Sequence, residues 1–395
     1  MIHDLIVFGE DWGGLPSSTQ HLVSQLAKRR KIVWVNSIGL RRPRFNWRDI
    51  KRALKKLSAT LLSGNKLSVN QQSRSGANIA MDKQKKVLPN DNFHIVYPRT
   101  LPAPRSRIGR WLAARLLISQ ITPIVQQAGL QSPILWISLP TAVDVAGKLG
   151  ESALVYYCGD DFSALAGVDH DTVARREAEL AEKSDLILYA SEELAGKFPT
   201  SRSYLLPHGV DFALFSRPAP RALDLPDDGR PIAGFYGSIS EWLDIEMLKE
   251  TIEQMPDWHF VFIGKPLVDI NVLRNFKNVH LLGERPHRQL PSYSQHWTAS
   301  LLPFVDNAQI KACNPLKLSE YLATGRPIVS TSFPAMEPFR GLVQVANTAG
   351  AMVEALKASQ HIDSLPAFKA ALRNTVANNS WVARAQQVSQ WIDAL

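Results

Sequence analysis

The stretch NPLKLSEYLATGRP, residues 314–327, predicts a helix whose two ends are both marked in the sequence. Asn314 suits the N-cap, Pro315 suits the first helical position because its missing N–H would have no partner there, and Gly325 suits the C-terminal cap. Apolar segments on either side of the helix read as buried strands of a parallel sheet. The helix N-terminus is therefore expected at the carboxyl edge of a sheet, where phosphate groups bind.

Two charged residues lie on one face of this predicted helix. Lys317 and Glu320 are three positions apart, which makes their side chains neighbours. A lysine near the positive end of the helix dipole and a glutamate one turn later suit a nucleotide sugar, with the lysine on the diphosphate and the glutamate on the ribose hydroxyls. Pro315 and Leu316, at the helix start, are assigned to the same donor site. A capped surface helix with an ordinary Lys/Glu pair explains the spacing equally well.

Length and composition indicate a two-domain globular protein. The chain has 395 residues, of which 45% are hydrophobic and 21% charged, and single cores stop growing well below this length. Cys158 and Cys313 lie far apart, fit no metal-ligand spacing and suit a reducing compartment. The first residues carry no signal-peptide pattern, and no apolar run is long enough to cross a bilayer. We therefore expect a cytoplasmic protein that does not span the membrane.

The positive charge is concentrated in the first third of the chain. Residues 1–115 hold 22 Lys/Arg against 6 Asp/Glu, whereas the remainder holds 23 against 30, within a net charge of +9. Such an asymmetry predicts that the N-terminal part faces an anionic partner.

The densest basic segment also has an apolar stripe. Trp47, Ile50, Leu54 and Leu57 recur every three or four residues, as on helices that lie in an anionic bilayer surface. Nucleic acid is a weaker alternative because the chain has no nucleic-acid signature, and a solvated basic face is the third interpretation. The residues assigned to this membrane or acceptor patch are Arg41, Arg42, Arg44, Trp47, Arg48, Lys51, Arg52 and Lys55.

Short β-branched runs alternate with helical patterns along the whole chain, which predicts an α/β fold with parallel sheets. We expect an N-terminal domain over residues 1–216, a linker at 217–230, a second α/β domain at 231–379 and a final helix at 380–395 that packs back on the first domain. The predicted strands are Leu5–Phe8, Ile32–Val35, Phe93–Tyr97, Ile134–Ile137, Leu154–Tyr157, Leu186–Tyr189, Tyr204–Leu206, Ile232–Tyr236, Phe260–Ile263, Val279–Leu282, Ser300–Phe304, Ile328–Ser330 and Val343–Val345.

Two strand ends carry groups suited to chemistry. Asp160 and Asp161 follow the strand 154–157, and α/β proteins place catalytic groups at such carboxyl ends. Mutual repulsion and desolvation would raise the pKa of one of the two acids, although either could instead cap the following turn. Gly237 and Ser238 follow the strand 232–236, where a glycine lets the backbone approach a diphosphate closely. An ordinary strand-to-helix turn would look the same.

These features together resemble a GT-B glycosyltransferase, in which two Rossmann-like α/β domains face each other across a cleft. The segment from Lys317 and Glu320 to Val329 resembles the second half of the E-x(7)-E motif of the group 1/4 enzymes. The first glutamate of that motif would fall at position 312, where this chain has Ala312. Retaining members use that glutamate near the donor sugar, so the proton transfer has to be sought across the cleft.

Three N-terminal segments extend the resemblance. The strand before Asp160 is similar to one in the inverting glucuronosyltransferase of xanthan assembly, which implies that Asp160 is the base. The segment 206–211 resembles an (N/H)-G-V-D segment of the family and implies that His208 shapes the cleft floor. Family members have a glycine-rich loop where this chain has Gly13 and Gly14. The remaining acceptor-side residues are Ser17 and His21. Either Ser17 or Ser18 is expected to cap the helix that follows, and His21 suits a helix face better than a ligand.

The resemblance implies an enzyme that moves a sugar from a nucleotide sugar, expected to be a UDP-sugar, to a lipid-linked oligosaccharide or polysaccharide in bacterial cell-surface polysaccharide biosynthesis. It implies no cofactor, no metal because D-x-D is absent, no nucleic acid, and peripheral association with the cytoplasmic face of the plasma membrane. A UDP-sugar epimerase of the same fold is one alternative. The other is a non-catalytic protein that binds membranes or polyanions on a degenerate transferase fold.

Overall fold

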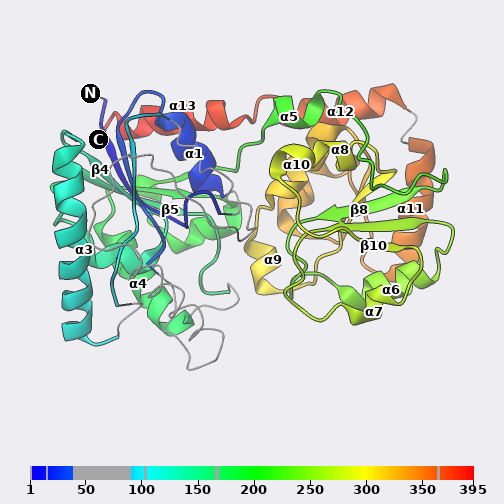
Figure 1. The fold of residues 1–395 in the computed structure, drawn as a ribbon, viewed down its shortest axis with the longest axis horizontal. Helices are drawn as coiled ribbons and strands as arrows, with labels where there is room; N and C mark the ends of the chain where they lie inside the picture. Colours follow the sequence, from blue (N-terminus) through cyan, green and yellow to red (C-terminus); the bar gives the residue numbers. More distant parts are fainter. Residues whose placement is uncertain (1, 15–16, 39–89, 102–104, 165–168, 363–364) are drawn as a thin grey trace, which may run out of the picture.

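Two parallel sheets, each covered by helices, lie side by side in the computed structural model (Figure 1). The structure describes residues 2–14, 17–38, 90–101, 105–164, 169–362 and 365–395. Every strand expected from the sequence is present, and the ends differ by no more than two residues. The predicted α/β class with two Rossmann-like halves is confirmed.

Within the described residues, the first sheet has seven strands in the order β3-β2-β1-β4-β5-β6-β7, and all neighbours pair in parallel. The chain starts in the middle, builds toward β3, and then crosses to β4 on the other side of β1. The strands are β1 (Leu5–Phe8), β2 (Ile32–Val35), β3 (Phe93–Val96), β4 (Ile134–Ile137), β5 (Ala153–Cys158), β6 (Leu186–Tyr189) and β7 (Ser203–Leu205).

The second sheet repeats this topology. Its strand order is β10-β9-β8-β11-β12-β13, so β8 and β11 flank the point at which the chain changes direction. Ligands of open α/β sheets bind outside the carboxyl ends of the strands at such a point. The strands are β8 (Ile232–Tyr236), β9 (His259–Ile263), β10 (Val279–Leu281), β11 (Ala299–Leu302), β12 (Ile328–Ser330) and β13 (Gln344–Val345).

Helices cover both faces of each sheet, as expected for parallel sheets whose strands are buried on both sides. Those before β8 are α1 (Ser18–Leu26), α3 (Arg107–Gln127), η1 (Pro140–Val145), α4 (His170–Lys183), η2 (Glu192–Lys197), η3 (Thr200–Arg202) and α5 (Phe212–Ser216). Those after β8 are α6 (Ile245–Glu253), α7 (Asn271–Arg274), η4 (His287–Gln289), α8 (Pro291–Ser294), α9 (Ala308–Ala312), α10 (Leu316–Thr324), η5 (Pro334–Phe339), α11 (Ala349–Ile362), α12 (Pro366–Val376) and α13 (Trp381–Ile392).

The start of α10 differs from the prediction. Asn314 does not cap the helix, because its side-chain amide donates a 3.0 Å hydrogen bond to the carbonyl of Ala190 in the first half of the chain. Pro315 occupies the N-cap position instead of the first helical position, and α10 has no side-chain cap. Gly325 closes the helix in the left-handed conformation at φ 73°, as predicted. The Asn314 side chain, which was predicted to cap the helix locally, therefore forms a contact between the two halves instead.

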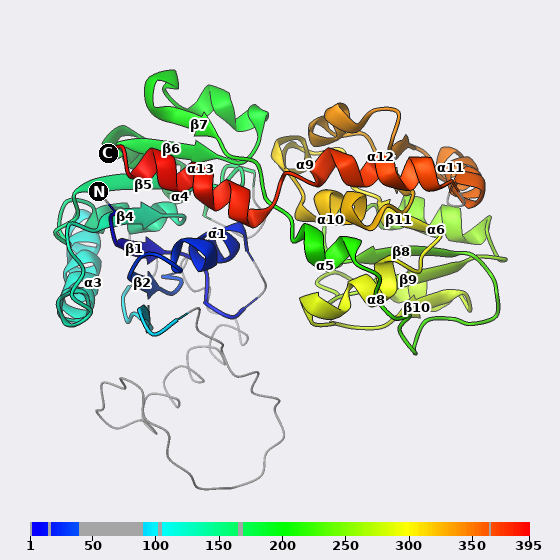
Figure 2. The same cartoon turned by 90° about the horizontal axis from the view of Figure 1, so that it is seen from above.

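The last helix, α13, crosses back onto the first sheet, as predicted (Figure 2). Its buried side chains Trp381, Ala385, Val388 and Ile392 belong to the same hydrophobic cluster as the apolar residues of β1 and α1. The buried Arg30 pairs with Asp393 at 2.7 Å and fixes the end of the helix. At the start of the crossing, the amide of Val210 donates to the carbonyl of Asn379 at 2.8 Å. The two chain crossings between the halves are thus hydrogen-bonded to each other.

Candidate active site

The turn after β8 brings Gly237 against Lys317 of α10. Gly237 has φ 130°, a conformation that side chains rarely adopt, and a Cβ atom there would overlap Cε of Lys317. Its amide donates to the carbonyl of Ile263 at 2.8 Å, which holds the turn against β9. Ser238 is half-buried, and its hydroxyl has no hydrogen-bond partner among the described residues. A ligand at this turn would therefore meet backbone, a free hydroxyl and the lysine together.

Lys317 supplies a cation for which the described residues provide no counter-ion. Its ammonium forms no ion pair with a described residue and lies 5.7 Å from the centre of the Phe235 ring. Burial lowers the pKa of Lys317, and the nearby Glu320 and Cys313 oppose this shift. The amides of Leu316 and Lys317 at the uncapped start of α10 likewise donate to no described residue. An ammonium beside free amides at a helix N-terminus is suited to a phosphate group.

Glu320, one turn further along α10, is held by two neighbours. It is 8% exposed, and its two carboxylate oxygens contact the hydroxyl of Tyr236 at 2.7 Å and Nε2 of His287 at 2.6 Å. Burial alone would lower the pKa of His287, but the hydrogen bond and charge of Glu320 outweigh it, and the pKa is raised. Each oxygen of an ionised carboxylate can accept a second hydrogen bond. The two contacts therefore orient Glu320 and leave acceptor sites open for a ligand.

On the opposite half, the two adjacent acids after β5 have different surroundings. Oδ1 of Asp161 accepts from the amide and hydroxyl of Ser163 and pairs with Lys197 at 2.9 Å. These contacts outweigh its partial burial and lower its pKa. Asp160 keeps access to solvent, yet desolvation by the protein around it, followed by repulsion from Glu10 and Asp161, raises its pKa to about 6. Asp160 is the acid with the properties of a base at neutral pH.

The loop after β1 approaches the same edge. Gly13, at φ 73°, and Gly14 are exposed, and the amide of Gly13 lies 3.3 Å from Oε1 of Gln20. Ser17 caps α1, as predicted, and its hydroxyl donates to Glu10 at 2.9 Å. Glu10 is in turn one of the charges that raise the pKa of Asp160. Glu10 of the glycine loop therefore lies near Asp160.

Histidines from both halves meet where the chain crosses between them. His21 stacks on Trp381 with ring centres 4.7 Å apart, and its ring lies 5.8 Å from that of His287. Nδ1 of His208 contacts the hydroxyls of Ser18 at 2.8 Å and Tyr157 at 3.2 Å. Burial is the largest cause that lowers the pKa of both His21 and His208 to about 4. Both are therefore neutral at physiological pH, and through His287 the cluster touches Glu320.

The connection between α9 and α10 contacts the first half of the chain and lies near both Asp160 and Lys317. The hydroxyl of Ser191, after β6, donates to the carbonyl of Ala312 at 2.7 Å. Burial raises the pKa of the neighbouring Cys313 thiol to about 12, with Asp160 raising it further and Lys317 opposing. Because both charges act on one thiol, Asp160 of the first half and Lys317 of the second half both lie near Cys313. Ala312, which directly precedes Cys313, stands where the E-x(7)-E motif has its first glutamate.

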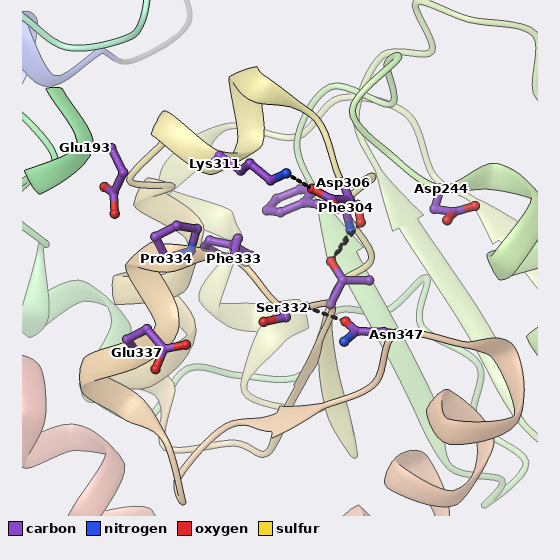
Figure 3. Close-up of a pocket in the computed structure, with 11 residues that line it drawn as sticks. Glu193, Asp244, Phe304, Asp306, Lys311, Ser332, Phe333, Pro334, Glu337 and Asn347 are labelled. Atoms are coloured by element: carbon purple, nitrogen blue, oxygen red, sulfur yellow. Dashed lines mark hydrogen bonds and ion pairs between the residues drawn. The ribbon is translucent and has the colours of Figure 1, made fainter.

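A pocket of about 790 Å³ opens beside this connection, at the carboxyl ends of β11, β12 and β13 (Figure 3). Glu193 of η2 lines one side, and Lys311 and Asp306, paired at 2.9 Å, line another. The Asn347 side chain accepts from the amide of Ser332 at 2.8 Å and presents its amide group to the pocket. Carboxylates, an amide and hydroxyl groups beside aromatic rings suit a hydroxyl-rich ligand.

Some predictions fall outside what the structure describes. All of the predicted basic patch, residues 41–55, lies outside the described residues. In the described part of the chain, no three His, Cys, Asp or Glu side chains converge as metal ligands. No described helix is long and apolar enough to cross a bilayer.

The structure adds three residues to the predicted set. His287 and Tyr236 hold Glu320, and Glu10 acts on Asp160. Tyr236 is the last residue of a predicted strand, and His287 begins the short helix η4 between β10 and β11, so no motif marks either of them. Glu10 stands in the glycine loop, where its distance from Asp160 in the sequence conceals their proximity.

Comparison with known proteins gives one family match and one curated relative. Residues 230–362 match the family described as Glycosyl transferases group 1. A Bacillus subtilis (strain 168) protein, TuaH, which is assigned as a glycosyltransferase of teichuronic acid biosynthesis, is 26% identical over 239 residues. That match covers 55% of this chain and 60% of TuaH, so the chain spans about three fifths of the length of this relative.

Solved structures match the whole chain. Sucrose-phosphate synthase from Thermosynechococcus elongatus superposes with a TM-score of 0.67 at 15% identity, over 99% of this chain and 98% of that one. Anabaena Alr3699/HepE in complex with UDP-glucose superposes with a TM-score of 0.65 at 11% identity, over 100% of both chains. At these identities the similarity establishes the fold. The chain therefore has the GT-B fold, and its residues 230–362 match the family described as Glycosyl transferases group 1.

Proposed function

We propose that this protein is a glycosyltransferase that transfers a sugar from a UDP-sugar to a hydroxyl group of a saccharide acceptor in bacterial cell-surface polysaccharide biosynthesis. The observation that carries the proposal is the unpaired Lys317 beside Gly237 and the open N-terminus of α10, with Asp160 on the opposite half. The family match, the TuaH relative and the fold shared with a UDP-glucose complex support the same conclusion.

The donor would be held along α10. Lys317 and the amides of Leu316 and Lys317 would bind the diphosphate, and Gly237 and Ser238 would allow its close approach. Glu320 would accept hydrogen bonds from the ribose hydroxyls through the lone pairs that Tyr236 and His287 leave open. The pocket beside Ala312 would accommodate sugar hydroxyls next to the diphosphate.

The chemical step assigned to Asp160 is general-base catalysis of an inverting transfer. The acceptor oxygen attacks the anomeric carbon, the bond from that carbon to the phosphate oxygen breaks, and the hydroxyl proton passes to the Asp160 carboxylate. Negative charge then develops on the leaving diphosphate, where Lys317 and the helix N-terminus stabilise it. The step needs no metal in this proposal, so a chelator should leave the rate unchanged.

The acceptor would be a lipid-linked oligosaccharide or polysaccharide at the cytoplasmic face of the plasma membrane. The excess of positive charge in residues 1–115 supports an anionic surface as partner, and the basic segment 41–55 would contribute to it. Both cysteines are free, which agrees with a reducing compartment.

Calorimetric titration with UDP tests the donor site directly. We expect Lys317→Met and Glu320→Gln each to weaken UDP binding at least tenfold, because each removes a contact to a charged group worth about 1.5–3 kcal/mol. Lys311→Met, on the pocket rim, is the matched control and should retain UDP affinity. Unchanged affinity in the Lys317 and Glu320 variants would exclude this site. Release of a free sugar isomer in the absence of acceptor would instead identify an epimerase.

A further inference from the structure

The outward face of α3 is apolar although it is exposed. Ile108, Trp111, Leu112 and Leu116 are 79%, 56%, 42% and 38% exposed, and their spacing of three and four residues places them on one side of the helix. The opposite side of α3 packs into the core of the first sheet, so the helix is apolar on both sides where a helix on a protein surface would be polar. A contiguous exposed apolar face of this kind indicates an interaction site.

The sequence of α3 and of the residues around it carries positive charge only. Residues 92–143 contain no aspartate or glutamate. Arg107 and Arg115 are exposed on the same side of α3 and form no ion pair with a described residue, and the Arg115 guanidinium lies 4.9 Å from the centre of the Trp111 ring. By contrast, Arg105 and Arg110 are paired with acids of the protein. The unpaired arginines are therefore those that flank the apolar side chains.

The apolar face lies at the same edge of the sheet as Asp160. The chain that leaves the carboxyl end of β3 runs along α3, with the amide of Arg99 bonded to Gln120 at 2.9 Å and the hydroxyl of Thr100 bonded to Ala113 at 3.1 Å. The first turns of α3 consequently lie beyond the strand ends, and Asp160 follows the carboxyl end of the parallel strand β5. In both views α3 forms the outer edge of the first half, away from the second sheet (Figures 1 and 2).

We propose that this α3 face, formed by Ile108, Trp111, Leu112 and Leu116 with Arg107 and Arg115, docks on an anionic lipid bilayer. The aliphatic side chains and Trp111 would enter the boundary between headgroups and acyl chains, and the arginines would bind lipid phosphates. Charge complementarity selects this occupant, since Arg107 and Arg115, which pair with no described acid, flank apolar side chains and so match an anionic apolar interface. The inference rests on the proposed function. Docking at this face would turn the sheet edge that carries Asp160 toward the membrane that holds the acceptor.

The test is co-sedimentation of the full-length protein with vesicles of phosphatidylethanolamine and phosphatidylglycerol, with phosphatidylcholine vesicles as the neutral comparison. We expect Trp111→Ser/Leu112→Ser to reduce partitioning more than tenfold, since each side chain buried in the bilayer contributes a free energy of this order. Arg107→Gln/Arg115→Gln should reduce it about fivefold for each arginine, and only on the anionic vesicles. Gln126→Ala/Gln127→Ala, exposed at the other end of α3, is the matched control and should partition like the unmodified protein.

UDP titration of the same variants separates this inference from the proposed function. Reduced partitioning with unchanged UDP affinity supports the α3 face, whereas absence of UDP binding in the unmodified protein would defeat the transferase proposal alone. If Trp111→Ser/Leu112→Ser partitioned onto anionic vesicles within twofold of the unmodified protein, the proposal that the α3 face docks on a membrane would be overturned. It would also be overturned if that variant converted a dimer into a monomer, or if it unfolded at a much lower temperature, because the face would then be covered by a second copy or by the chain itself.

Discussion

The two adjacent acids after β5 illustrate how neighbours assign different roles to identical side chains. Asp161 accepts from Ser163 and pairs with Lys197, which stabilises its charged form. Asp160, which is exposed, has no such partner among the described residues, and desolvation by nearby protein, followed by the charges of Glu10 and Asp161, raises its pKa to about 6. A carboxylate with this pKa is still mostly ionised at neutral pH and binds a proton more strongly than an ordinary aspartate.

Replacement of Asp160 is predicted to lower the rate of sugar transfer without weakening UDP binding. Asp160→Asn should lower turnover by about a hundredfold or more, since general-base catalysis contributes at least that much, while UDP affinity stays unchanged. Asp161→Asn is the matched control and should retain most activity, with a lower unfolding temperature because Lys197 loses one partner. Steady-state rates and UDP calorimetry on both variants check this. Full activity of Asp160→Asn would place the base elsewhere.

The pH dependence of the rate should follow Asp160. The base acts in its ionised form, so kcat/KM is predicted to rise with pH up to about 6 and to level off above it. Repulsion from Glu10 contributes to this pKa, and Glu10→Gln should therefore shift the midpoint to lower pH. A midpoint that stays in place in Glu10→Gln would contradict the assignment of the titrating group.

At the scale of elements, α10 organises the donor side. Its first turn is uncapped because Asn314 is bonded to Ala190, and its next turn carries Glu320 between Tyr236 and His287. The helix thus presents amides and an ammonium at its start and an oriented carboxylate one turn later. This order matches the diphosphate and ribose of a nucleotide.

His287 is predicted to position Glu320 for the ribose. His287→Leu should weaken UDP binding about tenfold, because a hydrogen bond to a charged carboxylate is lost, and it should also abolish the preference for UDP over 2′-deoxy-UDP and 3′-deoxy-UDP. His287→Gln keeps a donor N–H and should restore part of both properties. Affinities for the three nucleotides check this, since a purely structural defect would lower all of them equally. A retained preference in His287→Leu would exclude the positioning role.

The sequence predicted the elements well because burial on both faces of parallel strands produces apolar runs such as those of β1, β4 and β8, bounded by glycine and polar residues. Asp160, Lys317 and Glu320 were chosen as site residues by their place at strand ends and on one helix face, and their roles stay predictions. The sequence could not predict the contacts between the halves. Asn314 was wrongly assigned to a local cap because its partner, Ala190, is 124 positions away.

At the scale of the whole molecule, α13 connects the two halves through Trp381. This side chain packs in the core of the first sheet, fills the space left by the absent side chain of Gly209 and stacks on His21. His21 in turn lies beside His287, which holds Glu320. Packing of the last helix is therefore connected to the donor site by direct contacts.

Two tryptophans of α13 provide a matched test of this connection. Trp381→Ala should lower the free energy of unfolding by about 3 kcal/mol or more, as expected for loss of a buried tryptophan, and should also raise the KM for the UDP-sugar. Trp391→Ala removes a partly buried tryptophan stacked on Tyr204 at the far end of the helix and should destabilise the protein without changing KM. Denaturant unfolding and steady-state kinetics on both variants check this. An equal KM in the two variants would show that α13 acts only on stability.

The hydrogen bond between Val210 and Asn379 has a mechanical consequence. The two crossings between the halves run in parallel and are paired at Val210 and Ser380, so they cannot rotate independently of each other. A single strand between two bodies permits twisting as well as bending, whereas a pair of linked strands bends about one axis and resists torsion. Opening and closing of the two halves would then follow one repeatable path. This path would return Asp160 and Lys317 to the same relative position in every turnover.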